Sequence, residues 1–172
     1  VRNALTYARR SGLKGVHDVV AMLLQVPREY ETAMDMALGG AMQNIVTETE
    51  QDAKVLIDYL RKNRLGRATF LPLNTVRGRT LTAREREVLS LPGCIGVASE
   101  LCGYDPIYRG VVESLLGRTV VVEDLDCGIA MARKFRSAFR IVTLDGQVMN
   151  RGGSMTGGST SRSAGVLSRA NE

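Results

Sequence analysis

The sequence predicts an α+β fold in which one α/β unit occurs twice. Three observations support this. A stretch of the chain repeats itself, each copy mixes apolar helical stripes with short β-branched runs, and the composition is that of a globular protein, with 44% hydrophobic and 24% charged residues. The 172 residues suffice for one domain or two small ones. No apolar run approaches the roughly 20 residues that span a bilayer, so we expect no membrane partner.

The repeat begins with residues 15–39, which match residues 93–117 at a constant offset of 78. In both copies apolar residues recur at i, i+3, i+4, i+7 and i+8, which predicts amphipathic helices that face a core. A glycine follows each stripe, Gly39 in the first copy and Gly117 in the second, and it predicts the end of each helix.

The match resumes at an offset of 75, where Ile45-Val46 and Val120-Val121 predict short strands. A second helix is predicted around residues 53–60 and 128–135, with Asp126 as the cap of the later one. Residues 68–71 and 140–143 read as paired strands, so each copy is roughly strand, helix, strand, helix, strand. A polar and basic connector joins the copies and is expected to contain a short helix over residues 82–89.

The two copies differ after the first helix. The first has three more residues there, and it reads Gly39-Gly40-Ala41-Met42-Gln43-Asn44 where the second has Gly117-Arg118-Thr119. Small residues occur where another backbone comes close. The first copy therefore predicts a small-residue surface for head-to-tail assembly with a second chain.

A glycine-rich segment follows the last predicted strand. Gly152-Gly153 and Gly157-Gly158 flank Ser154-Met155-Thr156, and this density of glycine predicts positive φ angles or close approach of another backbone. A nucleotide phosphate loop needs a Gly-Lys-Ser/Thr ending, and a dinucleotide loop needs Gly-x-Gly-x-x-Gly; neither pattern is present. Close backbone packing is favoured, with a phosphate cradle and a flexible linker as alternatives.

Positive charge is concentrated in residues 61–86, where eight basic residues accompany one acid, while the whole chain carries +5. Such a region on a near-neutral body is typical of phosphate-backbone binding, and a solvated basic face is the alternative. The candidate DNA contacts are Arg61, Lys62, Arg64, Arg67, Arg77 and Arg79.

Catalytic and metal chemistry have little support. Cys94, Cys102 and Cys127 form no C-x-x-C pair and His17 is the sole histidine, so we expect buried thiols in a reducing cytoplasm and no metal site. An enzyme using Asp124, Asp126 or Asp145 beside the glycine loop is the weakest alternative, because no nucleophile–base pair accompanies these residues.

Several motifs of the chain, taken together in the order in which they occur, resemble the hinge domain of SMC (structural maintenance of chromosomes) proteins. They are most similar to the bacterial condensin type. The motifs that carry the resemblance are residues 15–24, 37–46, 66–73, 104–106 and 152–158. The resemblance implies coiled-coil stumps at 1–12 and 161–172 around a hinge at 13–160. It divides the hinge into subdomain I at about 15–75, a connector at 76–92 and subdomain II at about 93–158.

The resemblance also implies a V-shaped or ring-like homodimer with a central hole, in which each lobe contacts the opposite lobe of its partner. The interface glycines would be Gly39, Gly40, Gly152, Gly153, Gly157 and Gly158. Arg151 departs from the family, where a small residue or proline is expected, and Cys94 and Cys102 are idiosyncratic.

The function implied is that of a dimerising, DNA-contacting module in chromosome condensation and segregation, cytoplasmic and nucleoid-associated, with no catalysis or cofactor of its own. ATP and Mg would bind at ATPase heads outside this chain, as would kleisin-type and accessory subunits, because the chain contains neither Walker motif nor the ABC signature. The start at Val1 fits a fragment of a longer protein. A ligand-binding regulatory dimer of duplicated α+β units remains the alternative function.

Overall fold

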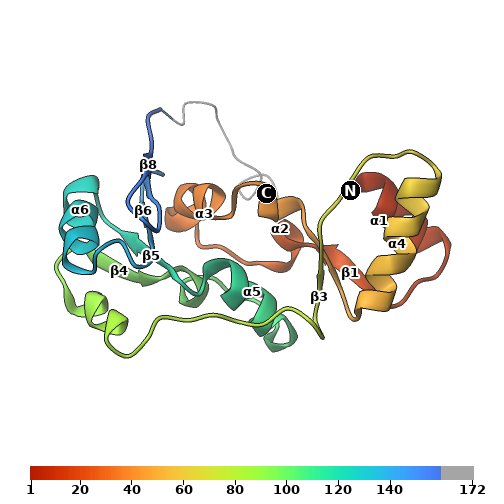
Figure 1. Ribbon diagram of the computed structural model, residues 1–172, viewed down its shortest axis with the longest axis horizontal. Coiled ribbons are helices and arrows are strands. Elements are labelled where there is room, and N and C mark those ends of the chain that lie inside the picture. The colour runs from red at the N-terminus through yellow and green to blue at the C-terminus, as the bar shows by residue number, and fades with distance from the viewer. Residues whose placement is uncertain (160–172) are drawn as a thin grey trace.

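The computed structural model describes residues 1–159, and its two lobes lie side by side along the long axis of the molecule (Figure 1). We name residues 15–75 lobe I and residues 93–158 lobe II. Each lobe has a small mixed sheet with helices packed on it, so the predicted α+β fold of two repeated units is confirmed. Among the described residues no helix is both long and apolar enough to cross a bilayer.

Lobe I contains a three-stranded sheet in the order β1-β2-β3. β2 is antiparallel to β1 and parallel to β3. The elements of this half of the chain, including helix α1 before the lobe, are α1 (Arg2–Arg10), β1 (Val16–Val19), α2 (Val20–Leu23), η1 (Arg28–Tyr30), α3 (Glu31–Leu38), η2 (Gly39–Gln43), β2 (Ile45–Thr47), α4 (Glu50–Lys62) and β3 (Phe70–Pro72), where η denotes a 3-10 turn.

Lobe II repeats this arrangement and extends it to five strands, in the order β4-β5-β6-β7-β8. β5 is antiparallel to β4 and parallel to β6, as in lobe I, and β7 and β8 add antiparallel strands. The elements, including η3 in the connector, are η3 (Glu85–Ser90), β4 (Cys94–Val97), η4 (Ala98–Glu100), η5 (Pro106–Tyr108), α5 (Arg109–Leu116), β5 (Thr119–Val122), α6 (Leu125–Lys134), β6 (Arg140–Thr143), β7 (Val148–Met149) and β8 (Met155–Thr156).

The β-branched runs that the repeat aligns are the most buried parts of the chain. Ile45, Val46, Val120 and Val121 have no exposed surface, as expected for central strands covered on both faces. Ala37 of lobe I and Val112 of lobe II belong to one continuous hydrophobic cluster. The lobes therefore share a core.

The prediction of helices over residues 15–39 and 93–117 is wrong for the first part of each segment. Val16–Val19 and Cys94–Val97 are strands, and the helices that end at the predicted glycine stops are Glu31–Leu38 and Arg109–Leu116, with the short helix Val20–Leu23 in the first copy. A buried apolar strand followed by a turn cannot be told from a helical stripe by spacing alone.

Three smaller predictions also need correction. The connector forms the 3-10 turn Glu85–Ser90 in place of a helix over 82–89. β3 pairs with β2 and β6 pairs with β5, so the two predicted strands do not pair with each other. The cap of α6 is Asp124, whose carboxylate accepts a hydrogen bond from the Cys127 N–H at 2.9 Å, whereas Asp126 lies within the first turn.

The predicted N-terminal stump contains a helix, α1, that packs on α4. Ala4 and Ala8 are buried, and the rings of Tyr7 and Tyr59 stack with centroids 3.9 Å apart. The predicted C-terminal stump, residues 161–172, lies outside the described residues.

Candidate dimer interface and basic surfaces

The glycine-rich segment at residues 152–158 forms the turn of a hairpin and the edge strand β8. Gly152 and Gly153 occupy the turn between β7 and β8, and β8 is the last strand of the sheet (Figure 1). The carbonyl of Ser154 accepts a hydrogen bond from Asn150 N–H at 2.8 Å, which faces β7. Main-chain groups alternate in direction along a strand, so those of Met155 and Gly157 face the open side.

A side chain holds the far end of β8 in place. The amide of Gln147 accepts a hydrogen bond from Gly158 N–H at 2.8 Å and donates one to the Gly158 carbonyl at 3.0 Å. A Cβ atom on Gly157 would overlap this amide. Gly157 therefore has a reason to be glycine within the single chain.

Most of the other candidate glycines also have a local reason. Gly39, Gly152, Gly153 and Gly158 have φ angles of +53°, +88°, +107° and +135°, which L side chains rarely adopt. Gly40 differs, because its φ is ordinary and a Cβ there would meet nothing within 4 Å. No residue among 1–159 gives Gly40 a steric reason to lack a side chain, so this glycine is the best candidate for contact with a second molecule.

The outer edge of lobe I is open at β3. The Thr69 carbonyl and the Leu73 N–H bond to β2 at 3.0 and 2.8 Å, so by alternation the main-chain groups of Phe70 face outward. Pro72 also faces outward and has no N–H to donate, which suits an edge strand. In lobe II the matching edge, that of β6, is covered by the antiparallel strand β7.

Hydrogen bonds between the lobes fix the position of lobe I, with its edge strand β3, relative to lobe II, with its edge strand β8. The Arg140 guanidinium, at the start of β6, donates hydrogen bonds to the carbonyls of Ala37 and Met36 at the end of α3, the first at 2.5 Å. Gln25 and Gly103 exchange two main-chain bonds of 2.8 Å. His17 Nδ1 and the Tyr108 hydroxyl lie 2.8 Å apart. These contacts hold the lobes in one orientation.

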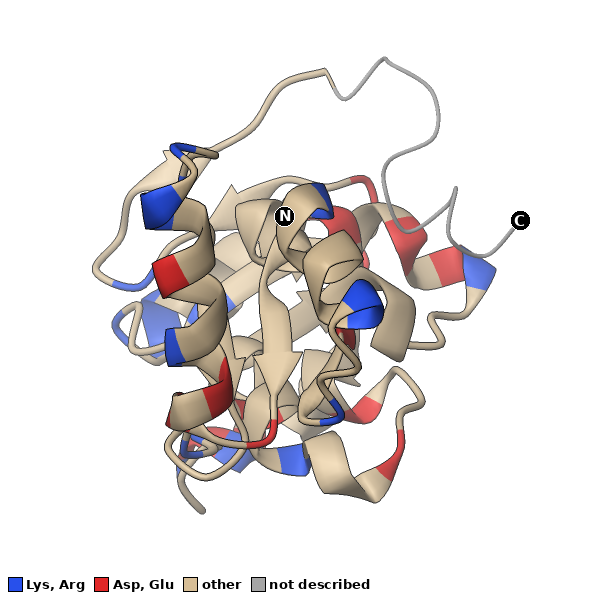
Figure 2. Ribbon diagram, turned by 90° about the vertical axis from the view of Figure 1, so that its right-hand side faces the viewer, with Lys and Arg blue, Asp and Glu red and all other residues tan. Residues whose placement is uncertain are grey.

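The structure divides the candidate DNA contacts into two groups. Arg61, Lys62, Arg64 and Arg67 lie on the last turn of α4 and the loop after it, before β3; Arg77 and Arg79 follow β3, on the connector. On the α1 and α4 end of the molecule, basic and acidic residues are interspersed (Figure 2). Arg61 itself donates a hydrogen bond to Asp58 at 2.9 Å.

A further cluster of arginines was not found from the sequence. Arg79, Arg118, Arg140 and Arg151 line one pocket of about 180 Å³ in lobe II, together with Ser114, Leu115, Thr119 and Phe139. These residues are dispersed over the chain, so no local charge run reveals them. Two of them gave a signal in the sequence: Arg79 as a candidate DNA contact and Arg151 as a departure from the family pattern.

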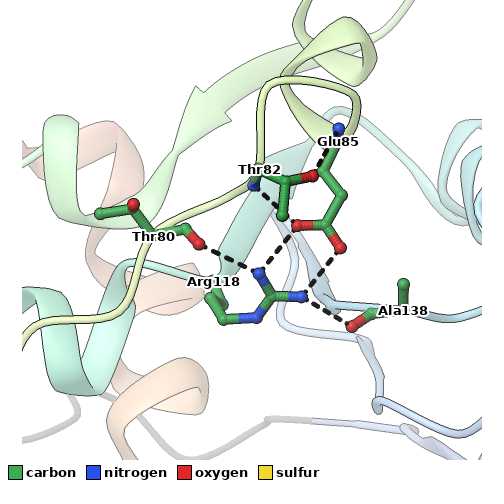
Figure 3. Close-up of polar contacts among 5 residues, drawn as sticks. All are labelled: Thr80, Thr82, Glu85, Arg118 and Ala138. Atoms are coloured by element: carbon green, nitrogen blue, oxygen red, sulfur yellow. Dashed lines mark hydrogen bonds and ion pairs between the residues drawn. The ribbon is translucent and has the colours of Figure 1, made fainter.

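Arg118 is held in place by a paired carboxylate (Figure 3). Its guanidinium donates to both oxygens of Glu85, at 2.8 and 2.9 Å, and to the carbonyls of Thr80 and Ala138. These hydrogen bonds lower the pKa of Glu85 to about 2. The connector is thus tied to the start of β5 by a bidentate ion pair.

The catalytic alternative finds no support in the positions of its residues. Besides capping α6, Asp124 has a lowered pKa because of the Cys127 N–H. The pKa of Asp145 is lowered by hydrogen bonds from Thr143 and Gln147 within its own turn. Such carboxylates are poor proton acceptors near neutral pH.

The three cysteines are unpaired, and burial raises the pKa of Cys102 to about 11. Within residues 1–159 no three His, Cys, Asp or Glu side chains are grouped as metal ligands.

Comparison with known proteins gives consistent matches. Residues 13–132 match the family described as SMC proteins Flexible Hinge Domain. The chain is 42% identical over 174 aligned positions to the Chromosome partition protein Smc of Bacillus subtilis (strain 168), covering 100% of this chain and 14% of that protein. It thus spans about a seventh of that relative's length.

Solved structures of similar sequence share the fold. The Geobacillus stearothermophilus SMC hinge domain, described as an asymmetric dimer, superposes with a TM-score of 0.89 at 43% identity, over 98% of this chain and 69% of that one. The Pyrococcus furiosus SMC hinge domain gives a TM-score of 0.75 at 32% identity, over 94% of this chain and 82% of that one.

Proposed function

The chain belongs to the SMC hinge family, and on that premise we propose that it joins two SMC chains as a homodimer through the edges of its two sheets. β8 of one chain would pair with β3 of the other. The main observation is that, among residues 1–159, no strand covers β3 on the side where the equivalent strand β6 of lobe II has an antiparallel neighbour. Within the same residues, β8 ends its own sheet with unpaired main-chain groups.

This pairing would merge the three-stranded sheet of one chain with the five-stranded sheet of the other. A two-fold dimer contains the contact twice, so each lobe would meet the opposite lobe of its partner around a central hole. The ladder would be short, because Pro72 cannot donate and β8 has two residues. Gly40 and the glycine pairs around β8 would allow the backbones to approach.

The experiment that tests the dimer is a mass measurement in solution on the chain carrying Gly40→Trp. The indole would occupy space that is open in the single chain, so the monomer should fold and the dimer should weaken strongly. Gln51→Trp, on the exposed face of α4, is the matched control and should remain dimeric. An unmodified chain that is monomeric at tens of micromolar would refute the proposal.

We also propose that the dimer contacts duplex DNA without sequence preference, through phosphates. The support is that Arg64, Arg67 and Arg79 are exposed and make no ion pair with the residues described. Counterion release then predicts binding that weakens steeply with salt.

Reversing Arg61, Lys62, Arg77 and Arg79 to glutamate should weaken DNA binding at low salt and reduce the salt slope by about 3 to 4. Reversing Arg2, Arg9, Arg28 and Arg133, which are also exposed, changes the net charge equally and is the control. Equal loss in both variants would show that total charge decides binding, not these positions. Light scattering on both variants verifies that the dimer persists.

For the longer protein we propose a cytoplasmic, nucleoid-associated role in chromosome condensation and segregation. Its supports are the family and the name of the Bacillus relative, a chromosome partition protein. ATP and Mg, with kleisin-type and accessory subunits, would bind at head domains outside this chain. Catalysis would reside there as well.

A further inference from the structure

The pocket in lobe II collects positive charge from four separate segments. Arg79 comes from the connector, Arg118 from the turn before β5, Arg140 from the first residue of β6, and Arg151 from the turn between β7 and β8. At about 180 Å³ the pocket is smaller than sites for drug-sized ligands, which begin at about 300 Å³. Its size suits a single small charged group.

Two of the arginines are immobilised by the fold and form a rigid wall. Arg118 is held by Glu85 and two carbonyls. Arg140 is held by the carbonyls that end α3, and its Nε is buried without a hydrogen-bond partner among the described residues. Burial lowers the pKa of Arg140, because desolvation disfavours its positive charge.

The charges in the pocket are not balanced. Glu85 offsets the charge of Arg118, but Arg79, Arg140 and Arg151 have no carboxylate partner among residues 1–159. Like charges brought together are unfavourable unless an anion joins them. Thr119 also lines the pocket, is 3% exposed and carries a hydroxyl group that can donate a hydrogen bond.

We propose that this arginine pocket binds a phosphate group. Guanidinium groups match phosphate oxygens in geometry, and the guanidinium groups of Arg79 and Arg151 supply donors for a tetrahedral phosphate beside the free Nε of Arg140. An anion there would link Arg79 of the connector with Arg151 of the glycine turn, which leads into β8. Its binding therefore restrains the β7–β8 hairpin, whether the phosphate is free or belongs to a DNA strand.

The test titrates inorganic phosphate into the whole chain at constant ionic strength, with chloride as reference, and measures binding by calorimetry and the melting temperature. At ten times its dissociation constant, phosphate should raise the melting temperature by about 3 °C. Arg79→Gln and Arg151→Gln should each weaken phosphate binding at least tenfold. Arg10→Gln removes the same charge from exposed α1 and should bind as the native chain does.

A phosphate response equal in all three variants, or absent from the native chain, would overturn the proposal. A 20-base-pair duplex in competition with phosphate identifies the source of the group. If phosphate displaces the duplex and Arg151→Gln weakens duplex binding severalfold more than Arg10→Gln, the pocket takes a DNA phosphodiester. If duplex binding is unchanged while phosphate binding is lost, the pocket takes a free phosphate compound. Circular dichroism without ligand confirms the fold of each variant.

Discussion

Lobe I and lobe II share a three-strand pattern, yet they finish their sheets differently. After β6, the counterpart of β3, lobe II adds β7 and β8, whereas in lobe I β3 leads directly into the connector. The extra strands cover β6 and leave β8 as a new edge, while β3 stays uncovered. The difference shows how duplication of one unit can create two unlike edges that complement each other between chains.

Removing an outward-facing N–H from β8 should weaken the dimer more than any other change considered for the two edges. Met155→Pro should keep the hydrogen bonds to β7, since the Met155 main chain faces away from that strand. Over the two contacts of a dimer we expect a loss of about 2 to 4 kcal/mol, or roughly 100-fold in dimer affinity. Sedimentation equilibrium measures it.

Met155→Ala serves as the control for that experiment. It removes a side chain that is 54% exposed but retains the N–H. It should therefore dimerise like the native chain. If Met155→Pro dimerises equally well, β8 does not pair with a partner, and the edges of the two lobes are unrelated.

The ion pairs of the two lobes differ in burial and should differ in energetic weight. In the pair that braces lobe II, the Glu85 and Arg118 side chains are only 14% and 25% exposed. Glu85→Ala should destabilise the chain by about 2 kcal/mol, because it leaves Arg118 without its partner. In lobe I, Asp58 contacts Lys54 and Arg61 on the solvated face of α4, and Asp58→Ala should cause no measurable change. Urea unfolding compares the two.

The same ion pair predicts an acid dependence. The folded pKa of Glu85 is about 2, below its ordinary value of 4.5, so its contribution to stability is complete above pH 4.5 and is lost as the pH falls toward 2. The native chain and Glu85→Gln should therefore converge in stability over that window. Parallel curves from pH 6 to pH 2.5 would contradict this.

The repeat could be predicted because equivalent positions of the two lobes are buried, and buried positions in both copies carry similar apolar residues. The runs Ile45-Val46 and Val120-Val121 are fully buried in both lobes, and the sequence shows them as matching β-branched pairs. The predicted order gave each copy an opening strand, but the predicted helix was extended over the residues of β1 and β4, since apolar spacing in a short buried strand resembles a helical stripe. The prediction of the family did not depend on that error, because it rested on several sequence motifs and on the order in which they occur along the chain.

The candidate site was less predictable, for two physical reasons. The sequence identified the six candidate interface glycines but could not rank them. The structure shows that a positive φ or the Gln147 amide already explains five of them, and that neither explains Gly40. The arginine pocket was missed because its residues converge only after folding. Arg118 and Arg140 lie near the starts of neighbouring parallel strands, and parallel pairing brings such positions together at one end of the sheet.

The smallest expected difference between the lobes lies in how helix α4 of lobe I and helix α6 of lobe II begin. In lobe I, Thr49 accepts a hydrogen bond from Asp52 N–H at 3.2 Å while the Asp52 carboxylate accepts one from Thr49 N–H at 3.0 Å, a reciprocal capping box. In lobe II, the Asp124 carboxylate alone caps α6. Thr49→Ala should destabilise the chain by about 1 kcal/mol, because it removes one of two linked hydrogen bonds. Asp124→Asn keeps an oxygen that accepts the Cys127 N–H and should change stability little.

Native-state hydrogen exchange resolves the two helices separately, so faster exchange confined to the first turn of α4 in Thr49→Ala is the expected result. Equal acceleration in both variants would mean that the charge of Asp124, acting on the helix dipole, matters as much as the hydrogen bond it accepts.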